Sequence, residues 1–305
     1  MSRIMVIGSL NMDIVSRVEN YPLPGETIKG IKTDVNPGGK GANQAVAIAR
    51  AGGNVSMVGA IGTDVFGDQL LEALQQENIE TNNIIRKEGT SGLAVITVDS
   101  KGSNSIILLE GANGLLSMDD LTDILPEAIK DPANIFLLQN EVPWETTKNI
   151  IESLSASNAS IYLNPAPAQH IPTEIISKLT GIFLNEIEAT IITGLSVIDQ
   201  ESASAAAEKL IAYGVTEVII TLGEKGSLYR DFREHVYFTP GRKVNAMDTT
   251  AAGDTFIGAY LASKQQGYSI EASLEYATAA AALTVSREGA QKSIPYQEEI
   301  LQFLT

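Results

Sequence analysis

The amino-acid sequence predicts an α/β fold, a three-layer αβα sandwich whose central sheet is mostly parallel. Two observations support this prediction. Short apolar runs alternate along the chain with longer segments in which apolar residues recur at helical spacing. The runs are apolar at consecutive positions, which is typical of parallel strands covered by helices on both faces.

The predicted strands of the main sheet are the short apolar runs, and the predicted helices are the longer segments between them. From Gly253 onward the chain is predicted to be mostly helical, ending with Tyr296–Phe303. The strands are Ile4–Gly8, Val55–Ile61, Ile135–Leu138, Ile161–Leu163, Gly181–Leu184 and Val218–Leu222. The earlier helices are Ala42–Arg50, Phe66–Gln76, Glu145–Leu154 and Ser202–Tyr213.

Two regions interrupt this alternation, and each is predicted to be a β-hairpin. Hairpins inserted between strand–helix units can build a flap over a site, or they can be plain surface insertions. The pattern alone leaves both interpretations open. The hairpins pair Asp13–Val18 with Thr27–Val35 across the turn Pro22–Glu26, and Gly92–Val98 with Ser105–Leu109 across the turn Asp99–Gly102.

The composition excludes several classes of site. The 305 residues include no cysteine, which excludes disulfides, thiol catalysis and cysteine-ligated zinc or iron–sulfur centres. The two histidines, His170 and His235, lie far apart in the sequence, which argues against a multi-histidine metal centre. A chain without cysteine also fits the reducing cytoplasm, where we expect this protein to act.

The charge of the chain argues against nucleic acid and membranes as partners. Lys and Arg total 21 against 37 for Asp and Glu, a formal net charge of −16, so anionic polymers and lipid surfaces are repelled. The apolar run Ile4–Ile7 is too short for a signal peptide or a membrane span. A phosphate-bearing ligand would depend on local groups, such as helix N-termini, backbone amides, a lysine or a bound cation.

The segment Asp248–Phe256, Asp-Thr-Thr-Ala-Ala-Gly-Asp-Thr-Phe, is a candidate catalytic site. The small residues Ala251–Gly253 leave amides accessible at the start of a helix, where the helix dipole favours anions. Asp254 in the first turn could serve only as a cap. Bare amides beside an acid are, however, what phosphoryl transfer requires. The amides neutralise the migrating phosphoryl group, and the acid takes the proton of the acceptor hydroxyl.

Two further motifs lie near the N-terminus. Gly38–Gln44, Gly-Gly-Lys-Gly-Ala-Asn-Gln, opens a helix. It is not a P-loop, because Gly41 rather than Ser or Thr follows the lysine, and it is not a dinucleotide fingerprint either. It can be a ligand loop or simply a tight turn. Ser9–Asp13 follows the first strand, where ligands bind in open α/β sheets. Its Asn and Asp suit vicinal hydroxyls, although an Asx turn explains them too. Thr221–Gly226 and Asn185 with Glu188 are weaker candidates of the same kind, because each also follows a strand.

Together these motifs resemble those of the ribokinase family of sugar kinases, along essentially the whole chain. The resemblance implies one α/β sandwich domain over residues 1–305, with a small β-sheet lid from roughly residues 13–36 and 92–110. It also implies homodimers that form through the lid. The segments that carry the resemblance are Gly8–Asp13, Pro24–Glu26, Gly38–Ala45, Leu163–Ala168, Thr221–Gly226, Asp248–Phe256 and Gly289–Gln291.

By this resemblance the chain is an ATP-dependent kinase that phosphorylates the 5-hydroxyl of D-ribose. Asp254 is the implied general base, and Ala252 and Gly253 supply the anion-hole amides. The implied sugar-binding residues are Asn11, Asp13, Gly39, Lys40, Asn43, Glu141 and Asp254. Those implied for ATP are Asn185, Thr221, Gly223, Gly226, Gly253 and Thr278. Glu188 matches a position associated with Mg²⁺ and phosphate, and the implied K⁺ positions are Asp248, Thr250, Thr284, Arg287, Gly289 and Ser293.

Alternatives within and outside the family remain. A related kinase could act on deoxyribose, fructose, a nucleoside or tagatose phosphate, although Lys40 as the one basic residue of its motif disfavours a phosphorylated acceptor. A catalytically silent sugar sensor is disfavoured by the intact Asp254. Leu184 stands where the family usually has proline, and Thr278 occupies a position that varies in the family.

Overall fold

The computed structural model describes residues 2–305 and confirms the predicted fold class. Its main sheet contains β1 (Ile4–Ile7), β4 (Val55–Ile61), β5 (Glu80–Arg86), β8 (Ile135–Gln139), β9 (Ser160–Asn164), β10 (Gly181–Leu184), β11 (Glu217–Thr221), β12 (Gly226–Asp231) and β13 (Val236–Pro240). Within the described residues these nine strands lie in the order β13-β12-β11-β10-β9-β8-β1-β4-β5. Neighbours from β11 to β5 are parallel, and β12 and β13 add an antiparallel edge.

All six predicted strands are present, whereas β5, β12 and β13 were not predicted. β5 and β13 are edge strands with mixed burial, and β12 pairs with β11 as an antiparallel hairpin. Continuous apolar runs mark strands that are buried on both faces, so strands at the margin of the sheet lack that signal.

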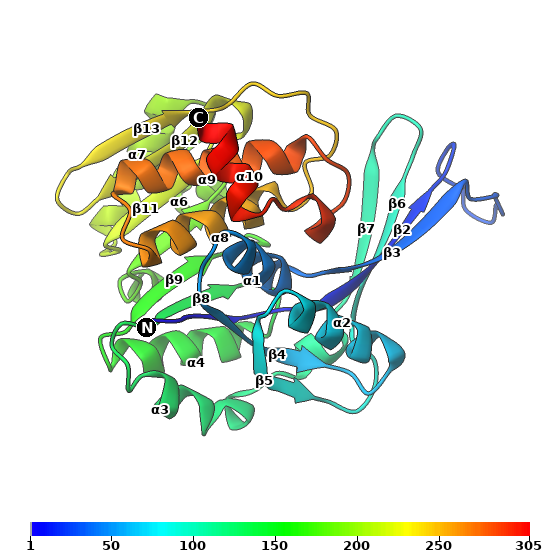
Figure 1. Ribbon diagram of the computed structural model, residues 1–305, viewed down its shortest axis with the longest axis horizontal. Helices are drawn as coiled ribbons and strands as arrows, with labels where there is room; N and C mark the ends of the chain where they lie inside the picture. Colours follow the sequence, from blue (N-terminus) through cyan, green and yellow to red (C-terminus); the bar gives the residue numbers. More distant parts are fainter. Residues whose placement is uncertain (1) are drawn as a thin grey trace.

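Helices cover both faces of the sheet, which gives the three layers (Figure 1). Two separate buried clusters fill the spaces between the sheet and the helices. One face carries α1 (Lys40–Arg50), α2 (Val65–Gln76), α8 (Ala252–Gln265), α9 (Ile270–Val285) and α10 (Gln297–Leu304). The other carries α3 (Ile124–Ala128), α4 (Trp144–Ser155), α5 (Thr173–Ile176), α6 (Glu186–Thr193) and α7 (Gln200–Ala212). Short 3₁₀ turns are η1 (Gly111–Leu115), η2 (Met118–Leu121), η3 (Gly223–Lys225) and η4 (Gln291–Ser293).

The packing of α1 against α8 brings two of the predicted motifs together. Gly258 on α8 lies so close to α1 that a Cβ there would stand 2.4 Å from the Cβ of Ala47. Only glycine permits this approach of the two backbones. The first turns of α1 and α8, which carry the Gly38–Gln44 and Asp248–Phe256 motifs, are therefore held side by side.

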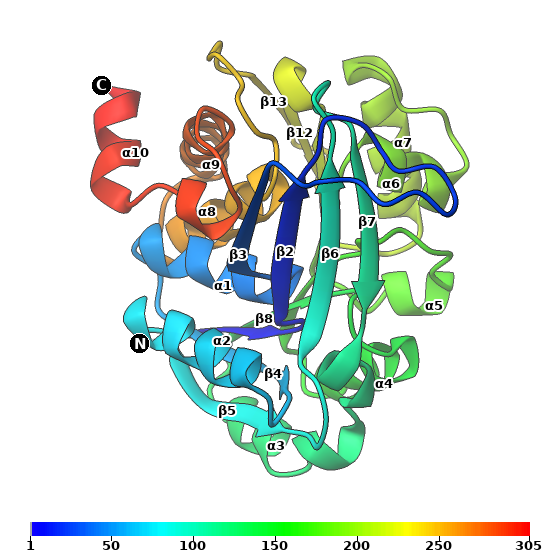
Figure 2. The same ribbon diagram turned by 90° about the vertical axis from the view of Figure 1, so that its right-hand side faces the viewer.

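A second sheet, which we call the lid sheet, stands beside the sandwich (Figure 2). It consists of β3 (Lys32–Gly38), β2 (Asn11–Arg17), β6 (Gly92–Val98) and β7 (Asn104–Leu109), in that order. Both predicted hairpins are found, β2 with β3 and β6 with β7, and β2 joins β6 in parallel.

The predicted second strand of the first hairpin, Thr27–Val35, is wrong in its bounds. Arg17 pairs with Lys32 and Asn11 pairs with Gly38, so the strand begins five residues later and includes Gly38. The Pro22–Glu26 turn lies within a longer connection between β2 and β3, because Val18 leaves this ladder and its amide donates to Val98 of β6 instead.

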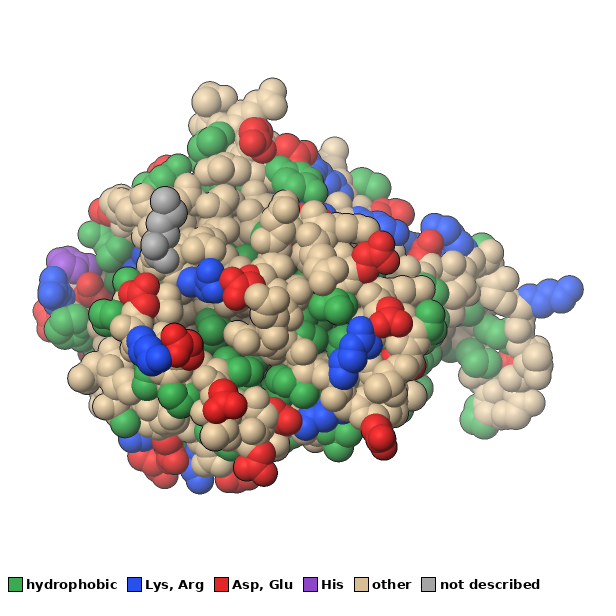
Figure 3. All heavy atoms as spheres, turned by 60° about the horizontal axis from the view of Figure 1, so that its bottom comes forward, with side chains coloured by type: hydrophobic (Ala, Val, Ile, Leu, Met, Phe, Trp, Pro, Cys, Tyr) green, Lys and Arg blue, Asp and Glu red, His purple; other side chains and the backbone are tan. Residues whose placement is uncertain are grey.

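None of the helices in residues 2–305 is long and apolar enough to span a membrane. On the face drawn in Figure 3, Lys and Arg side chains are scattered among Asp and Glu side chains and form no continuous basic area. This face therefore offers no surface complementary to a polyanion, in agreement with the net charge of −16.

Candidate active site

The candidate site lies where parallel strands of the main sheet end, next to the first turns of α1 and α8. A cavity of about 210 Å³ opens there. Asn164, Leu184 and Thr221, at the ends of β9, β10 and β11, line it. Ligand sites in α/β sheets are expected at this edge. The predicted site residues that line the cavity are Lys40, Asn185, Glu188, Thr221, Ala252, Gly253 and Asp254.

Asp254 is held in place by two amides from α1. It lies in the first turn of α8 and is only 8% exposed. Its Oδ2 accepts a hydrogen bond from Asn43 Nδ2 at 3.1 Å, and its Oδ1 accepts one from Gln44 Nε2 at 2.9 Å. Each carboxylate oxygen keeps a free lone pair, so the group can still accept a proton from a ligand hydroxyl.

The start of α8 has the features of an anion site. Ala251 precedes the helix in the left-handed conformation, with φ +60°, which costs a non-glycine residue roughly 1–2 kcal/mol. Within residues 2–305, the amides of Gly253 and Asp254 have no hydrogen-bond acceptor. Gly253 and Asp254 line the cavity, and a Cβ placed on Gly253 would meet no atom within 4 Å, so there is room for a ligand beside this turn. The two amides can donate to a phosphoryl group entering the cavity.

The glycine loop before α1 lies directly on the segment that follows β1. Gly39 has φ +89°, and a Cβ there would stand 2.8 Å from the backbone nitrogen of Asn11. Glu141 ties the two segments together, because its Oε2 accepts hydrogen bonds from Ser9 Oγ at 2.6 Å and from the Lys40 amide at 3.0 Å. The residues expected to bind sugar on these two segments are thus brought together with Glu141, which no motif of its own marks.

Asn11 and Asp13 reach the site from β2 of the lid sheet. Asn11 is fixed by Asn113, whose Nδ2 donates to Asn11 Oδ1 at 2.7 Å. Asn113 also bonds both backbone groups of Leu10, at 2.9 and 3.0 Å. Burial, with Glu141 and then Asp254 nearby, raises the pKa of Asp13 to about 7. The carboxyl groups therefore gather around one volume.

Sequence reasoning missed a buried amide chain behind Asp254. Gln139 Nε2 donates to Gln44 Oε1 at 2.6 Å, and Gln44 Nε2 is shared between Asp254 and Asn164 Oδ1, the latter at 3.1 Å. Asn164 in turn donates to the carbonyl of Phe183 at 3.2 Å. Gln44 and Asn164 lie inside motifs identified in the sequence, but the sequence does not show that they contact each other. Asn113 and Gln139 lie in no identified motif, so the sequence did not predict a role for them.

On the other side of the cavity, the Asn-x-x-Glu pattern is a helix cap. Asn185 Oδ1 accepts from the Glu188 amide at 2.8 Å, and Glu188 Oε2 accepts from the Asn185 amide at 2.9 Å, as in a capping box. Burial raises the pKa of Glu188 despite these bonds.

Burial alone would lower the pKa of Lys40, but the nearby carboxylates of Asp254, Glu141 and Glu188 outweigh burial, and the pKa of Lys40 is raised. Lys40 is therefore the cation at the centre of an acidic site.

The remaining residues expected to bind ATP lie farther from the cavity. Gly223 is in η3, and Gly226 begins β12 with φ +121°. A Cβ on Gly226 would stand 2.0 Å from the Thr239 carbonyl oxygen, so the packing of the backbone alone requires glycine at this position. Thr278 is buried on α9, and its hydroxyl has no partner among the described residues.

Two of the predicted potassium residues, Thr250 and Gly289, bond the carboxylate of Asp248. Its Oδ1 accepts from the Thr250 amide and hydroxyl at 2.9 and 2.6 Å, and its Oδ2 accepts from the Gly289 amide at 3.0 Å. Ser293 is fully buried, and because its hydroxyl donates to the Ala290 carbonyl, it keeps its lone pairs. The Arg287 side chain turns away to Glu299, at 2.6 Å.

Thr284 Oγ1 is 3.1 Å from Thr255 Oγ1 on α8, which links the end of α9 to the same region. The donor atoms in this set are oxygens, which suits a hard monovalent cation. In residues 2–305 no group of three or more His, Asp or Glu side chains could hold a metal ion. Any cation here would depend mainly on carbonyl and hydroxyl oxygens.

The sequence and the fold match known carbohydrate kinases along their whole length. Residues 1–297 match the pfkB family of carbohydrate kinases. The ribokinase of Haemophilus influenzae is 39% identical over 301 residues, covering 98% of this chain and 97% of that protein. The deoxyribokinase of Salmonella typhimurium is 37% identical over 306 residues, covering 99% and 98%. The structure of Arabidopsis thaliana ribokinase complexed with ribose and ATP has a TM-score of 0.90 at 32% identity, covering 100% of this chain and 99% of that one. The chain therefore belongs to the pfkB family of carbohydrate kinases.

Proposed function

We propose that this chain transfers the γ-phosphoryl group of ATP to the 5-hydroxyl of D-ribose, forming ADP and ribose 5-phosphate. The observation that carries the proposal is the buried carboxylate of Asp254 beside the unpaired amides at the start of α8. Relatives named ribokinase, and the Arabidopsis complex with ribose and ATP, support ribose as the acceptor.

In this reaction Asp254 accepts the hydroxyl proton while the sugar oxygen bonds to the γ-phosphorus and the bond to the ADP oxygen breaks. The unpaired amide of Gly253 stabilises charge on the moving phosphoryl group. The amide of Ala252 joins it once it leaves the Thr249 carbonyl, to which it donates at 3.3 Å in the ligand-free chain. Asn11, Asp13, Gly39, Lys40, Asn43 and Glu141 bind ribose, since carboxylate and amide groups pair well with hydroxyls. Asn185, Thr221, Gly223, Gly226, Gly253 and Thr278 bind ATP.

The proposal includes two cations. Glu188 is the carboxylate that would hold Mg²⁺, which supplies charge neutralisation on the ATP phosphates when bound. The oxygens of Asp248, Thr250, Thr284, Arg287, Gly289 and Ser293 would hold K⁺ and keep the loop before α8 in position. We further propose that residues 1–305 form one domain that acts in the cytoplasm, with the lid sheet closing over the sugar to exclude water.

A second candidate function is phosphorylation of 2-deoxyribose, favoured by the deoxyribokinase relative at 37% identity. The two sugars differ by one hydroxyl. A site that hydrogen-bonds this hydroxyl discriminates strongly against the sugar that lacks it, because the buried partners are left unpaired.

The exposed apolar side chains of β7 support dimers through the lid sheet. Ile106, Ile107, Leu108 and Leu109 are 56%, 62%, 42% and 50% exposed, so this edge strand leaves both of its faces uncovered. Exposed apolar edges of this kind are usually covered by a partner. A second copy of the lid sheet is the proposed partner.

We expect Asp254→Asn to fold and bind both substrates but to lose turnover by roughly 10²–10⁴-fold, the usual contribution of a general base. Asn43 Oδ1 is buried without a partner among the described residues, so its amide can rotate to accept from the new amide. Steady-state kinetics with ribose and ATP measure the effect. Turnover within tenfold of wild type would exclude Asp254 as the base.

A sugar panel tests the acceptor. With ATP, Mg²⁺ and K⁺ present, ADP formation is expected to be fastest with ribose, and its kcat/KM should exceed that for 2-deoxyribose by at least about tenfold, the effect of one lost hydrogen-bonding group. Fructose and phosphorylated sugars serve as controls. A preference for 2-deoxyribose would favour the second candidate function over ribose phosphorylation. If no sugar supports ADP formation, the proposed kinase activity is overturned.

Asp13 is expected to make the empty site pH-sensitive. Because its folded-state pKa is about 7 and its ordinary value is 3.8, the folded chain binds more protons between these pH values. Stability therefore falls as pH rises from about 4 to 7. Asp13→Asn should leave the free energy of unfolding nearly unchanged near pH 4 and raise it by at most about 4 kcal/mol at pH 8.

Urea unfolding of the ligand-free protein at both pH values measures this difference. The exposed Asp119 on η2 provides a control, since Asp119→Asn should shift the free energy equally at both. An equal shift for Asp13→Asn would contradict the burial argument.

The dimer is tested on both faces of β7. Ile107→Lys combined with Leu108→Lys places a charge on each face and should convert dimers to monomers in light scattering. Ile187→Lys on α6, where the side chain is 70% exposed, should leave the mass unchanged. A wild-type monomer at micromolar concentration would refute the lid dimer without affecting the proposed reaction.

A further inference from the structure

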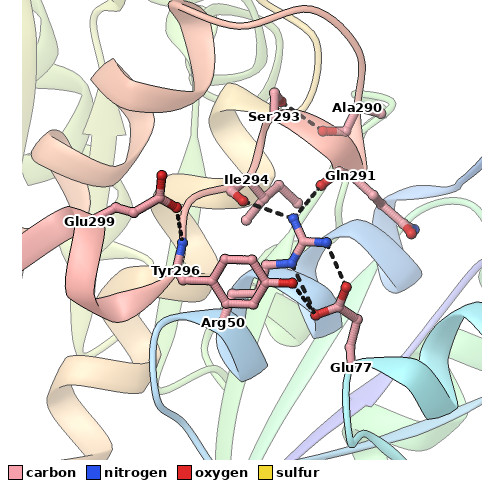
Figure 4. Close-up of polar contacts among 8 residues, drawn as sticks. All are labelled: Arg50, Glu77, Ala290, Gln291, Ser293, Ile294, Tyr296 and Glu299. Atoms are coloured by element: carbon pink, nitrogen blue, oxygen red, sulfur yellow. Dashed lines mark hydrogen bonds and ion pairs between the residues drawn. The ribbon is translucent and has the colours of Figure 1, made fainter.

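Arg50 ends the helix whose first turn carries Lys40, and its guanidinium makes polar contacts that the proposed reaction does not use (Figure 4). Its Nη1 donates to the carbonyl oxygens of Gln291 at 2.6 Å and Ile294 at 2.8 Å. Its Nε and Nη2 donate to the two carboxylate oxygens of Glu77 at 3.0 and 2.5 Å. The group also lies 4.7 Å from the ring centroid of Tyr296.

These contacts use nearly all of the hydrogen-bonding capacity of the guanidinium. The Arg50 and Glu77 side chains are 12% and 16% exposed, so the pair is largely removed from water. A planar group with fixed donor directions can bind a carboxylate and two carbonyls at once, whereas an ammonium group cannot match that geometry. The arrangement therefore requires arginine.

The two carbonyls belong to the segment that carries part of the proposed potassium site. Residues 289–294 leave α9 and turn through η4 before α10 begins. At one end the Gly289 amide donates to Asp248, and inside the turn Ser293 donates to Ala290. Arg50 holds the same turn from the α1 side, at Gln291 and Ile294. Without it, two buried carbonyls lose their charged donor.

Resting on the proposed function, we propose that Arg50 is a positioning residue that holds segment 289–294 in the shape that binds K⁺. It anchors this segment to α1, whose first residues contact Asp254. Asp248 provides a second connection, because it accepts a hydrogen bond from the Gly289 amide and lies in the loop just before α8. Groups that orient cation ligands typically affect affinity by roughly 10–100-fold.

The test is the thermal unfolding midpoint of ligand-free protein as KCl replaces NaCl at constant ionic strength. In wild type the midpoint should rise with K⁺ and saturate. In Arg50→Met the K⁺ concentration for half of this rise should increase by roughly 10–100-fold. Arg50→Lys, which keeps the charge but not the fork, should fall between them. The K⁺ concentration for half-maximal activity should shift in parallel, with the KM for ribose within about twofold.

Lys87→Met is the matched control. Lys87 pairs with Asp120 at 2.6 Å, with side chains 21% and 15% exposed, and both lie away from segment 289–294. It should lower the midpoint at every salt composition and leave the K⁺ dependence unchanged. Glu77→Gln, which keeps Arg50 but weakens its anchor, should give a smaller shift than Arg50→Met and decides the question if that variant does not fold.

An unchanged K⁺ dependence in the Arg50 and Glu77 variants would overturn the role of Arg50 while the potassium site stands. A wild-type protein indifferent to K⁺ would overturn the potassium site and the role of Arg50 together. The proposal that the chain phosphorylates ribose is tested separately, by ADP formation, and would stand after either result.

Discussion

The contact between the first turns of α1 and α8 is the constraint on which the rest of the site depends. Asn43 and Gln44 hold both oxygens of Asp254 across it, and Gly258 against Ala47 makes the close approach of the helices possible. α1 begins at the glycine loop that contacts the segments proposed to bind sugar, and α8 begins at the unpaired amides. One helix pair thus fixes the acceptor side and the phosphoryl side relative to each other, which is the positioning that phosphoryl transfer needs.

The site concentrates negative charge around one lysine, which lowers the stability of the ligand-free protein. Asp13, Glu141, Glu188 and Asp254 approach the same volume, and burial of Asp13 and Glu188 raises their pKa values. Hydroxyl-rich ligands satisfy such groups when they bind, so the empty site is less stable than the occupied one. Lys40 and the helix N-terminus are the permanent positive features that offset this charge for an incoming polyphosphate.

The parts of the fold predicted from sequence are those with a local signal. Buried parallel strands such as Val55–Ile61 have apolar runs, and the helix starts have small residues and caps. The edge strands β5 and β13, and β12 beside β13, have neither, and the bounds of β3 depend on the register with β2. The positions of Asn43 and Asp254 followed from motifs, but the bond between them joins residues 211 apart. The role of Arg50 could not be predicted from the sequence. Its carbonyl partners lie 241 and 244 residues away, and every residue type has a backbone carbonyl, so no side-chain pattern marks them.

The lid sheet joins the proposed sugar site at Asn11. β2 begins directly after β1, and Asn113 pins this junction by bonding Leu10 and Asn11 together. Asp13, two residues farther along, is already on the lid sheet, whereas Arg17 lies at its distal end, paired with Lys32. A rotation of the lid about the Asn11 junction would therefore move distal residues far and Asp13 little. In the proposed reaction, such a rotation would let the lid sheet exclude water while the groups proposed to bind sugar near the pivot keep their positions.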